Sequence, residues 1–265
     1  MNQVWVDGVV GAGIPGDDPA ITVGLSAFET LRTYGTHIFR LEQHLDRLMA
    51  SCEQMMLDPP SRSELRDEIV LRAGEDTVVR ITITGGGRRA IQVYPVDMER
   101  VGAPVTVATH RFSPSAALPG TVKHGSRASW MLAARRANAT EVLLVDGPHI
   151  LEANRSSVVA VVDGVLLTPS LDGRQLASIT RGAMLEAARA AGLPMEEVLL
   201  TAGVSFSELY LCSTLKELAP VVALDGIPGP GRGPLGSALH QAFRDLVDNE
   251  ALATGPLVPN PLPGR

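Results

Sequence analysis

The sequence predicts an α+β fold in two subdomains. Strand-like and helical patterns alternate through the first hundred residues, and the strand connections are too short and irregular for a doubly wound parallel sheet. The 265 residues are enough for one large domain or two modest ones. Hydrophobic residues make up 45% of the chain and aromatic residues only 4%, so Val, Leu, Ile and Ala must fill the core.

Hydrophobic periodicity predicts the elements of the N-terminal half in chain order. Apolar positions at helical spacing indicate a helix over Glu42–Leu57, which Pro59 ends. A second helix over Ser61–Gly74 begins with Ser61 as N-cap and Glu64 in the capping-box position. Alternating β-branched residues predict strands at Val4–Val10, Ala27–Tyr34, Thr77–Thr84 and Ile91–Pro95, the last two forming a hairpin.

The junction between the subdomains is expected where the pattern thins into extended chain, between Val101 and Gly120. We therefore predict a smaller N-terminal subdomain over 1–107, a connection over 108–120 and a larger C-terminal subdomain over 121–265. Helical periodicity and short β-branched runs predict the elements of the larger subdomain. The helices are Ser126–Asn138, Arg181–Ala191 and Ser237–Val247, and the strands are Glu141–Val145, Ser156–Val162, Val165–Thr168, Val198–Leu200, Glu208–Cys212 and Val221–Leu224.

The bulk composition excludes several classes of protein. A net charge of −6 argues against nucleic acid or an anionic membrane as a partner. No run approaches the roughly 18–20 apolar residues of a membrane span, and the N-terminus lacks the pattern of a signal peptide. Cys52 and Cys212 match no metal spacing and suit reduced thiols in a cytoplasmic protein. Six scattered histidines form no ligand pair, so no metal site is expected.

The chain contains 23 Lys and Arg residues, and only Lys123 and Lys216 are lysines. Arg stays protonated in proteins, whereas a desolvated Lys can lose its proton and attack a carbonyl carbon. The imbalance therefore raises Schiff-base chemistry as a hypothesis. The alternative is that two lysines persist by chance in an Arg-rich composition.

The segment Gly11–Gly16 matches the G-x-G-x-x-G pattern of dinucleotide-binding loops and follows a predicted strand. That function requires the glycines to open a helix whose N-terminus binds the pyrophosphate. Asp17, Asp18 and Pro19 follow instead, and the two acidic residues would repel phosphates. A surface loop is the better interpretation.

A set of dispersed residues carries the chemistry that one cofactor needs. Lys123 ends an extended stretch before a helix, and Glu152 lies at the edge of a strand. Thr180 stands at a helix N-terminus, where anions bind, and Ser213-Thr214 forms another hydroxyl-bearing turn. An amine, a carboxylate, two such turns and the cation of Arg47 would suit pyridoxal 5'-phosphate.

At these residues the chain resembles the fold-type IV pyridoxal-phosphate enzymes, which include branched-chain and D-amino-acid aminotransferases and aminodeoxychorismate lyase. The matching segments run in family order from about Gly24 to Val222. They comprise Gly24–Arg32 (GLSAFETLR), His44–Leu48 (HLDRL), Lys123, Glu152, Ile179–Arg181 (ITR), and Ser213-Thr214 with the trailing ELAPV of 217–221.

The resemblance implies a role for each matching residue. Lys123 is the catalytic lysine that joins the cofactor aldehyde, and Glu152 pairs with the pyridine nitrogen. Arg47, Ile179, Thr180, Ser213 and Thr214 bind the cofactor phosphate. The resemblance also implies a homodimer, with a smaller N-terminal α/β sandwich and a larger C-terminal β-rich pseudo-barrel with flanking helices.

The residues expected on the substrate side depart from the family patterns. Leu25 and Ser26 replace Asp and Gly of a G-D-G motif, and Ser157 stands in place of an Asn. Arg127, four residues after Lys123, resembles the K-x-x-x-R pattern of aminodeoxychorismate lyases. Candidate substrate contacts are Arg80, in place of the Tyr of a branched-chain Y-x-R pair, Arg127, Leu215 and Lys216, the last through its backbone N–H.

These departures favour 4-amino-4-deoxychorismate lyase, an enzyme of folate biosynthesis that releases pyruvate and 4-aminobenzoate from its small amino substrate. The alternative is a branched-chain or D-amino-acid aminotransferase of the same family. The cofactor residues cannot separate the two, because both reactions begin by removing the α-proton. A further alternative is a catalytically silent homologue that acts as a binding subunit.

Overall fold

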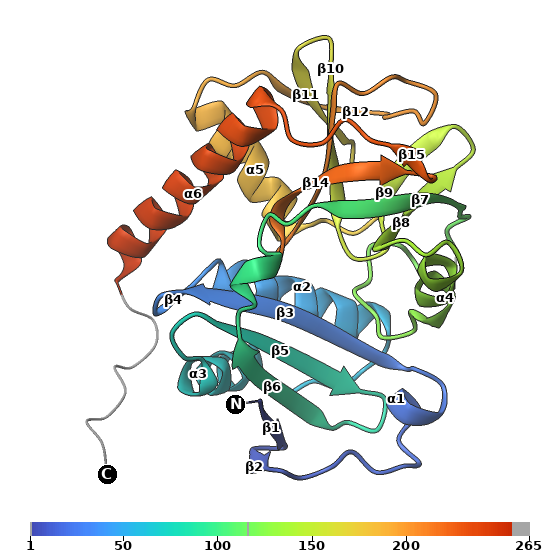
Figure 1. Cartoon of the computed structure of the whole chain (residues 1–265). Coiled ribbons are helices and arrows are strands. Elements are labelled where there is room, and N and C mark those ends of the chain that lie inside the picture. Colours follow the sequence, from blue (N-terminus) through green and yellow to red (C-terminus); the bar gives the residue numbers. More distant parts are fainter. Residues whose placement is uncertain (1, 116, 256–265) are drawn as a thin grey trace. The chain divides into compact units, whose positions relative to one another are not determined.

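The computed structural model describes residues 2–115 and 117–255, and the chain divides into two units (Figure 1). Unit 1 comprises Met1–Val96, Val122–Ser126 and Val247–Arg265, and unit 2 comprises Asp97–Thr121 and Arg127–Leu246. The division differs from the predicted boundaries at 107 and 121. The segment around Lys123 lies in unit 1, and residues 97–121 lie in unit 2.

Unit 1 is built on a six-stranded antiparallel sheet with the order β2-β1-β6-β5-β3-β4. Helix α2 (Leu41–Gln54) packs against β3, and helix α3 (Arg62–Arg72) packs against α2. The predicted capping box of α3 is present, since the Ser61 side chain accepts from the Glu64 N–H and Glu64 accepts from the Ser61 N–H. The strands are β1 (Gln3–Val6), β2 (Val9–Val10), β3 (Ser26–Tyr34), β4 (His37–Ile38), β5 (Thr77–Thr84) and β6 (Arg89–Pro95), and α1 spans Pro19–Thr22.

Unit 2 is built on a nine-stranded mixed sheet with the order β12-β11-β10-β13-β14-β7-β8-β9, and β15 pairs with β14. The pairs β7·β8, β7·β14 and β11·β12 are parallel, and the other pairs are antiparallel. The strands are β7 (Val105–Arg111), β8 (Glu141–Asp146), β9 (His149–Ala153), β10 (Ser157–Val162), β11 (Val165–Pro169), β12 (Met195–Val198), β13 (Glu208–Ser213), β14 (Glu217–Leu224) and β15 (Ile227–Pro228). The helices are η1 (Met98–Arg100), α4 (Ala128–Arg136), α5 (Ile179–Ala190) and the first part of α6 (Pro234–Thr254), whose residues from Val247 onward belong to unit 1.

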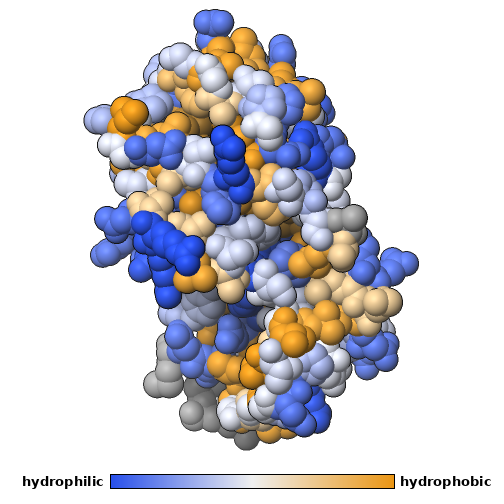
Figure 2. Space-filling view, turned by 90° about the vertical axis from the view of Figure 1, so that its right-hand side faces the viewer, coloured by the Kyte–Doolittle hydropathy of each residue, from blue (hydrophilic) through white to orange (hydrophobic). Residues whose placement is uncertain are grey.

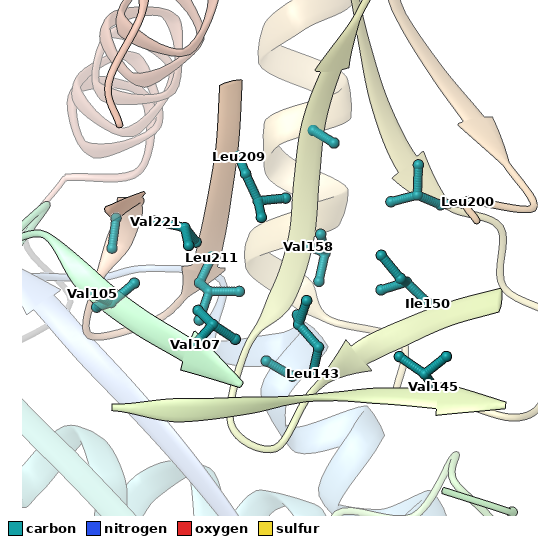
Figure 3. Packing of buried hydrophobic residues seen from close by; sticks show 13 residues of the cluster. Val105, Val107, Leu143, Val145, Ile150, Val158, Leu200, Leu209, Leu211 and Val221 are labelled. Carbon is teal, nitrogen blue, oxygen red and sulfur yellow. The ribbon is translucent and has the colours of Figure 1, made fainter. Parts of the chain in front are cut away.

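The sheet of unit 2 curls upon itself around a core of aliphatic side chains. Strands β9 and β10 are far apart in the strand order, yet they contact each other. Ile150 of β9, Val158 of β10 and Leu211 of β13 lie in one buried cluster (Figure 3). Val105 and Val107 of β7 belong to the same cluster. The curl places strands from most of the sheet around one core.

Strands β7, β9 and β12 of unit 2 differ from the prediction. Strand β7 forms within the stretch interpreted as extended chain, because only Val105 and Val107 show the apolar alternation and its last three residues, Thr109–Arg111, are polar. Strand β9 was not predicted as a full strand. Strand β12 ends at Val198 rather than beginning there, because its partner β11 pairs with Met195–Val198.

Hydrophobic and hydrophilic residues are interspersed on the face drawn in Figure 2. Among the described residues, no helix is long and apolar enough to cross a membrane. The same residues contain no group of three or more His, Cys, Asp or Glu side chains that could hold a metal ion.

Gly236 allows helix α6 to begin directly against β13. A Cβ atom on Gly236 would lie 2.0 Å from Cζ of Tyr210, whose side chain is fully buried. The carboxylate of Glu208 accepts from the N–H of Gly236 at 2.8 Å and so fixes the start of the helix. The ring cannot move aside, since it packs within the core.

We expect Gly236→Ala to lower the free energy of unfolding by about 1–3 kcal/mol through overpacking. Gly182→Ala in α5 is the matched control, because nothing lies within 4 Å of a Cβ at Gly182. There Ala should raise the free energy of unfolding by about 0.5–1 kcal/mol through its helix propensity. Urea titration of both variants measures the two changes, and equal effects would contradict the close approach at Tyr210.

Candidate active site

The segment that carries Lys123 lies along β3. The N–H of Phe28 donates to the carbonyl of Lys123 at 3.0 Å, and the N–H of Gly125 donates to the carbonyl of Ser26 at 2.8 Å. The N–H of Lys123 also donates to the hydroxyl of Ser51 in α2 at 3.1 Å. The lysine predicted to be catalytic is therefore fixed through its backbone to both a strand and a helix of unit 1.

Arg47 in α2 is bound by a buried carboxylate. Its Nε and Nη2 donate to the two carboxylate oxygens of Glu29 in β3, at 2.6 and 2.9 Å. His44, three residues earlier on the helix, places Nδ1 2.8 Å from Oε2 of Glu29. The side chains of Glu29 and His44 are 1% and 2% exposed. This arrangement fixes the guanidinium of Arg47 in one orientation.

Neighbouring charges keep Glu29 ionised despite its burial. Burial alone would raise the pKa of Glu29, but the Arg47 guanidinium, the His44 hydrogen bond and the positive charge of Lys123 hold it well below its ordinary value. Burial lowers the pKa of His44, so its imidazole is neutral at pH 7 and donates its Nδ1 proton to Glu29. The charge of the Lys123 amine thus acts on the same carboxylate as Arg47.

Phe28 of β3 lies against two cations. The guanidinium carbon of Arg80 lies 3.8 Å from the centroid of the Phe28 ring, and Nζ of Lys123 lies 5.1 Å from it. Arg80 pairs across the sheet with Thr30, two residues from Phe28, so both side chains are on one face. Arg80 is half-buried on this face, and one predicted substrate contact therefore lies beside Lys123.

In unit 2, Glu152 is half-buried on β9 and pairs across the strand ladder with Leu144 of β8. Arg127, at the start of α4, donates from Nη1 to the carbonyl of Asn154 at 2.7 Å. Its guanidinium also lies over the Trp130 ring at 5.0 Å. Arg127 is therefore engaged with the chain two residues after Glu152, and its contact with substrate stays a prediction.

The N-terminus of α5 carries open hydrogen-bond donors. Ser178 caps the helix through its side chain, which accepts from the N–H of Arg181 at 3.2 Å. Within the described residues, the N–H groups of Ile179 and Thr180 and the Thr180 hydroxyl donate to no protein acceptor. Thr180 is 4% exposed, so these donors are largely sheltered from solvent.

The turn between β13 and β14 presents two further hydroxyls. In the described part of the chain, the side chains of Ser213 and Thr214 form no hydrogen bond. The turn is tight, since the N–H of Lys216 donates to the Ser213 carbonyl at 3.2 Å and Glu217 has a φ of +53°. Glu217 is buried, and His240 lies 2.7 Å from its carboxylate. The turn is thus fixed from its C-terminal side.

The side chain of Lys216 forms an ion pair with a buried carboxylate. Its Nζ lies 2.5 Å from Oε1 of Glu141, a fully buried carboxylate, and 3.4 Å from the hydroxyl of Ser156. The backbone N–H of Lys216 already donates to the Ser213 carbonyl within the turn. Substrate contacts of Lys216 and of the half-buried Leu215 stay predictions.

Two residues around Arg47 were not predicted as site residues. Glu29 and His44 lie within motifs that the sequence shows, FETLR and HLDRL, but neither was assigned a role. The sequence did contain a signal for Glu29. An acidic residue in the middle of a strand with a buried, apolar pattern requires a cationic partner. Arg47 of the HLDRL motif supplies that partner in the structure.

The family of the chain follows from comparison with known proteins. The family model for class IV amino-transferases matches residues 26–224. A D-alanine aminotransferase of Listeria monocytogenes is 28% identical over 91% of this chain and 92% of its own length. The branched-chain-amino-acid aminotransferase-like protein 1 of Arabidopsis thaliana is 28% identical over 89% of this chain. The chain spans 48% of that longer relative.

Solved structures share the fold. A branched-chain aminotransferase of Thermoproteus uzoniensis with norvaline superposes with a TM-score of 0.83 at 23% identity, over 94% of this chain and 95% of the other. The pyridoxal-phosphate-bound form of a hypothetical aminotransferase from Mycobacterium tuberculosis gives a TM-score of 0.79 at 25% identity, over 94% and 100%.

The fold is therefore that of the fold-type IV enzymes, and the predicted α+β class is confirmed. The chain belongs to the class IV aminotransferase family. Its members are enzymes that use pyridoxal 5'-phosphate, so the predicted family, enzyme class and cofactor are confirmed.

The residues of this chain fit that cofactor. In unit 2, the open donors are two backbone amides of α5 and the hydroxyls of Thr180, Ser213 and Thr214, a set that suits a phosphate. In unit 1, Lys123 supplies an amine and Arg47 a cation whose orientation is fixed. The chemical types that the cofactor requires are all present.

Proposed function

We propose that this protein is a pyridoxal-phosphate-dependent aminotransferase that moves an amino group between a small amino acid and a 2-oxo acid. The observation that carries the proposal is the match to the class IV family together with relatives named D-alanine and branched-chain aminotransferases. These names favour the aminotransferase alternative over the predicted lyase. No relative reported above is named aminodeoxychorismate lyase.

When bound, the cofactor supplies an aldehyde that joins amines and a ring that accepts the electron pair of the substrate Cα–H bond. Nζ of Lys123 would hold the aldehyde, and as a free amine it would accept the α-proton of the substrate and give it back. The fixed backbone of Lys123 keeps this amine in position for both transfers.

The remaining proposed residues bind and orient. Glu152 accepts a hydrogen bond from the pyridine nitrogen and keeps that nitrogen protonated. The residues proposed to bind the phosphate are Arg47, Ile179, Thr180, Ser213 and Thr214. Arg47 would add a charge-assisted hydrogen bond from a guanidinium that Glu29 already orients.

The experiment is a spectrum of the purified protein with pyridoxal phosphate, followed by single additions of D-alanine, L-alanine, L-leucine and aminodeoxychorismate. Conversion of the bound cofactor to its pyridoxamine form by an amino acid alone supports the aminotransferase. Release of 4-aminobenzoate from aminodeoxychorismate would instead identify the lyase. Failure to bind the cofactor would contradict both activities and favour the silent homologue.

We further propose that the protein acts as a homodimer, which sedimentation velocity would test. A cytoplasmic location stays a prediction from the sequence.

A further inference from the structure

The segment that carries Lys123 packs closely against the start of β3. A Cβ atom on Gly125 would lie 2.2 Å from Oγ of Ser26, closer than two such atoms can approach. A Cβ atom on Gly24 would lie 2.8 Å from Oγ of Ser126, and that hydroxyl donates to the Gly24 carbonyl at 2.8 Å. Each segment thus places a glycine against a serine of the other.

The two glycines are required for different reasons. Gly24 has a φ of +73°, so any side chain is strained there whatever lies opposite. Gly125 does not have a positive φ, so its surroundings rather than its backbone exclude a side chain. Cβ of Ser26 and the carbonyl oxygen of Gly24 are each 3.6 Å from the position of the added Cβ, an ordinary contact. The conflict at Gly125 is therefore confined to one atom, the hydroxyl oxygen of Ser26.

Ser26 stands where the G-D-G motif has its second glycine, which carries no side chain. Ser26 is 6% exposed, and its hydroxyl forms no hydrogen bond with the described residues. The side chain therefore contributes packing rather than a polar contact. The missing side chain of Gly125 provides the space that Ser26 needs.

This contact lies next to the residue predicted to be catalytic. The N–H of Phe28 donates to the Lys123 carbonyl and the N–H of Gly125 to the Ser26 carbonyl, on either side of one antiparallel residue pair. Residues two apart along such a ladder share a face, so Ser26 and Gly125 lie on the face of Phe28 and Lys123. A ladder of two bonds is short, and close-packed atoms transmit strain, so a displacement at Gly125 also moves Lys123.

We infer that Ser26 and Gly125 are positioning residues for Lys123, and that Ser26 can replace the motif glycine because residue 125 has no side chain. Together they set how closely the Lys123 segment approaches β3. The inference rests on the proposed function, because it takes Lys123 as the residue that joins the cofactor aldehyde. Neither Ser26 nor Gly125 moves a proton in this scheme.

The test compares Gly125→Ala, Ser26→Ala and the double variant with the natural protein. Ser26→Ala removes only the hydroxyl oxygen that conflicts with a side chain at position 125, and it keeps the Cβ at 3.6 Å. Gly13→Ala is the matched control in unit 1. Nothing lies within 4 Å of a Cβ at Gly13, and its φ is not positive.

Two measurements separate the position of Lys123 from general damage to the protein. The first is the rate at which Lys123 captures pyridoxal phosphate, followed by borohydride quenching and peptide mass mapping. The second is the affinity for pyridoxamine 5'-phosphate, which carries an amine in place of the aldehyde and cannot join a lysine. Urea titration establishes that each variant is folded under the conditions of both measurements.

We expect Gly125→Ala to slow capture at Lys123 by roughly 10- to 100-fold, because a displacement of about 1 Å misaligns the amine with the aldehyde. The affinity for pyridoxamine phosphate should change little. The double variant should recover most of the loss, because the oxygen that excludes the new Cβ is gone. Ser26→Ala alone should slow capture less than Gly125→Ala does, and Gly13→Ala should leave it unchanged.

Equal capture by Gly125→Ala and the natural protein would overturn the inference, because Ser26 would then turn aside without moving Lys123. A double variant no faster than Gly125→Ala would also overturn it, since the glycine would then be required for another reason. So would a parallel fall in pyridoxamine phosphate affinity, which indicates damage to the whole site. A natural protein that captures the cofactor on Lys123 but transfers no amino group would contradict the proposed function alone.

Discussion

Replacing Lys123 by Ala is expected to lower amino-group transfer by about 10⁴-fold or more, because the only proposed amine and proton acceptor is removed. Lys123→Arg should fail equally, since a guanidinium keeps its proton and cannot join an aldehyde. The backbone contacts of Lys123 with Phe28 and Ser51 use main-chain atoms and should survive both changes. Activity with an amino donor and a 2-oxo acceptor is the measurement.

The composition of the chain allows a direct check of the same prediction. Borohydride reduction of the cofactor-loaded protein, followed by peptide mass mapping, should place the cofactor on the Lys123 peptide. Lys216 is the only other lysine of the sequence, and its amine is paired with the buried Glu141. A modified Lys216 peptide with an unmodified Lys123 peptide would contradict the assignment.

Glu29→Gln is expected to lower the free energy of unfolding by about 3–5 kcal/mol at pH 7, because it leaves the Arg47 charge without its buried partner. The affinity for pyridoxal phosphate should fall as well, while the affinity for pyridoxal, which lacks the phosphate, should change little. Denaturant titration and cofactor titration measure the two effects. Loss of affinity for both compounds would show that Glu29 does not act through Arg47.

The pH dependence of this effect follows from the direction of the pKa shift. The pKa of Glu29 is lower in the folded than in the unfolded protein, so its contribution to stability is fully present above the ordinary value of 4.5. The contribution falls only as the pH drops below that value toward the folded pKa. The difference between the natural protein and Glu29→Gln should therefore be constant from pH 6 to 8 and shrink in acid.

Glu42→Gln is the matched control for Glu29→Gln. Glu42 also pairs with arginines, Arg62 and Arg66, but its side chain is 51% exposed. Solvent screens such pairs, so this change should cost at most about 1 kcal/mol at any of these pH values. A similar loss in both variants would indicate that burial is not the source of the Glu29 effect.

Local signals predicted most of unit 1. The capping box at Ser61 and Glu64 and the alternation over Thr77–Thr84 depend on residues near in sequence, and both features are present. Long-range pairing was harder to predict. Strand β7 has few apolar residues and is stabilised by β8 and β14, which lie far along the chain. Its sequence alone therefore reads as a linker.

In the candidate site, too, local sequence predicted some residues, and long-range packing determined others that were missed. Motif spacing singled out Lys123 and Arg47, and the structure gives both an ordered setting. The partners Glu29 and His44 were missed because their importance arises from burial between β3 and α2. The sequence could not decide whether Arg80 faces solvent. Strand alternation assigns residues to the two faces of the sheet, but it does not say which face other parts of the protein cover. The contact with Phe28 decides it.

The place of β7 in the sheet also bears on how the protein is made. β7 pairs in parallel with β8 and with β14, whose residues 217–224 are synthesised more than one hundred positions later. A growing chain on the ribosome therefore exposes one unpaired edge of β7 until β14 has been made. Parallel pairings of this kind close slowly, and bare edges invite association with other chains. Truncations before β14 should accordingly aggregate rather than yield a smaller folded unit.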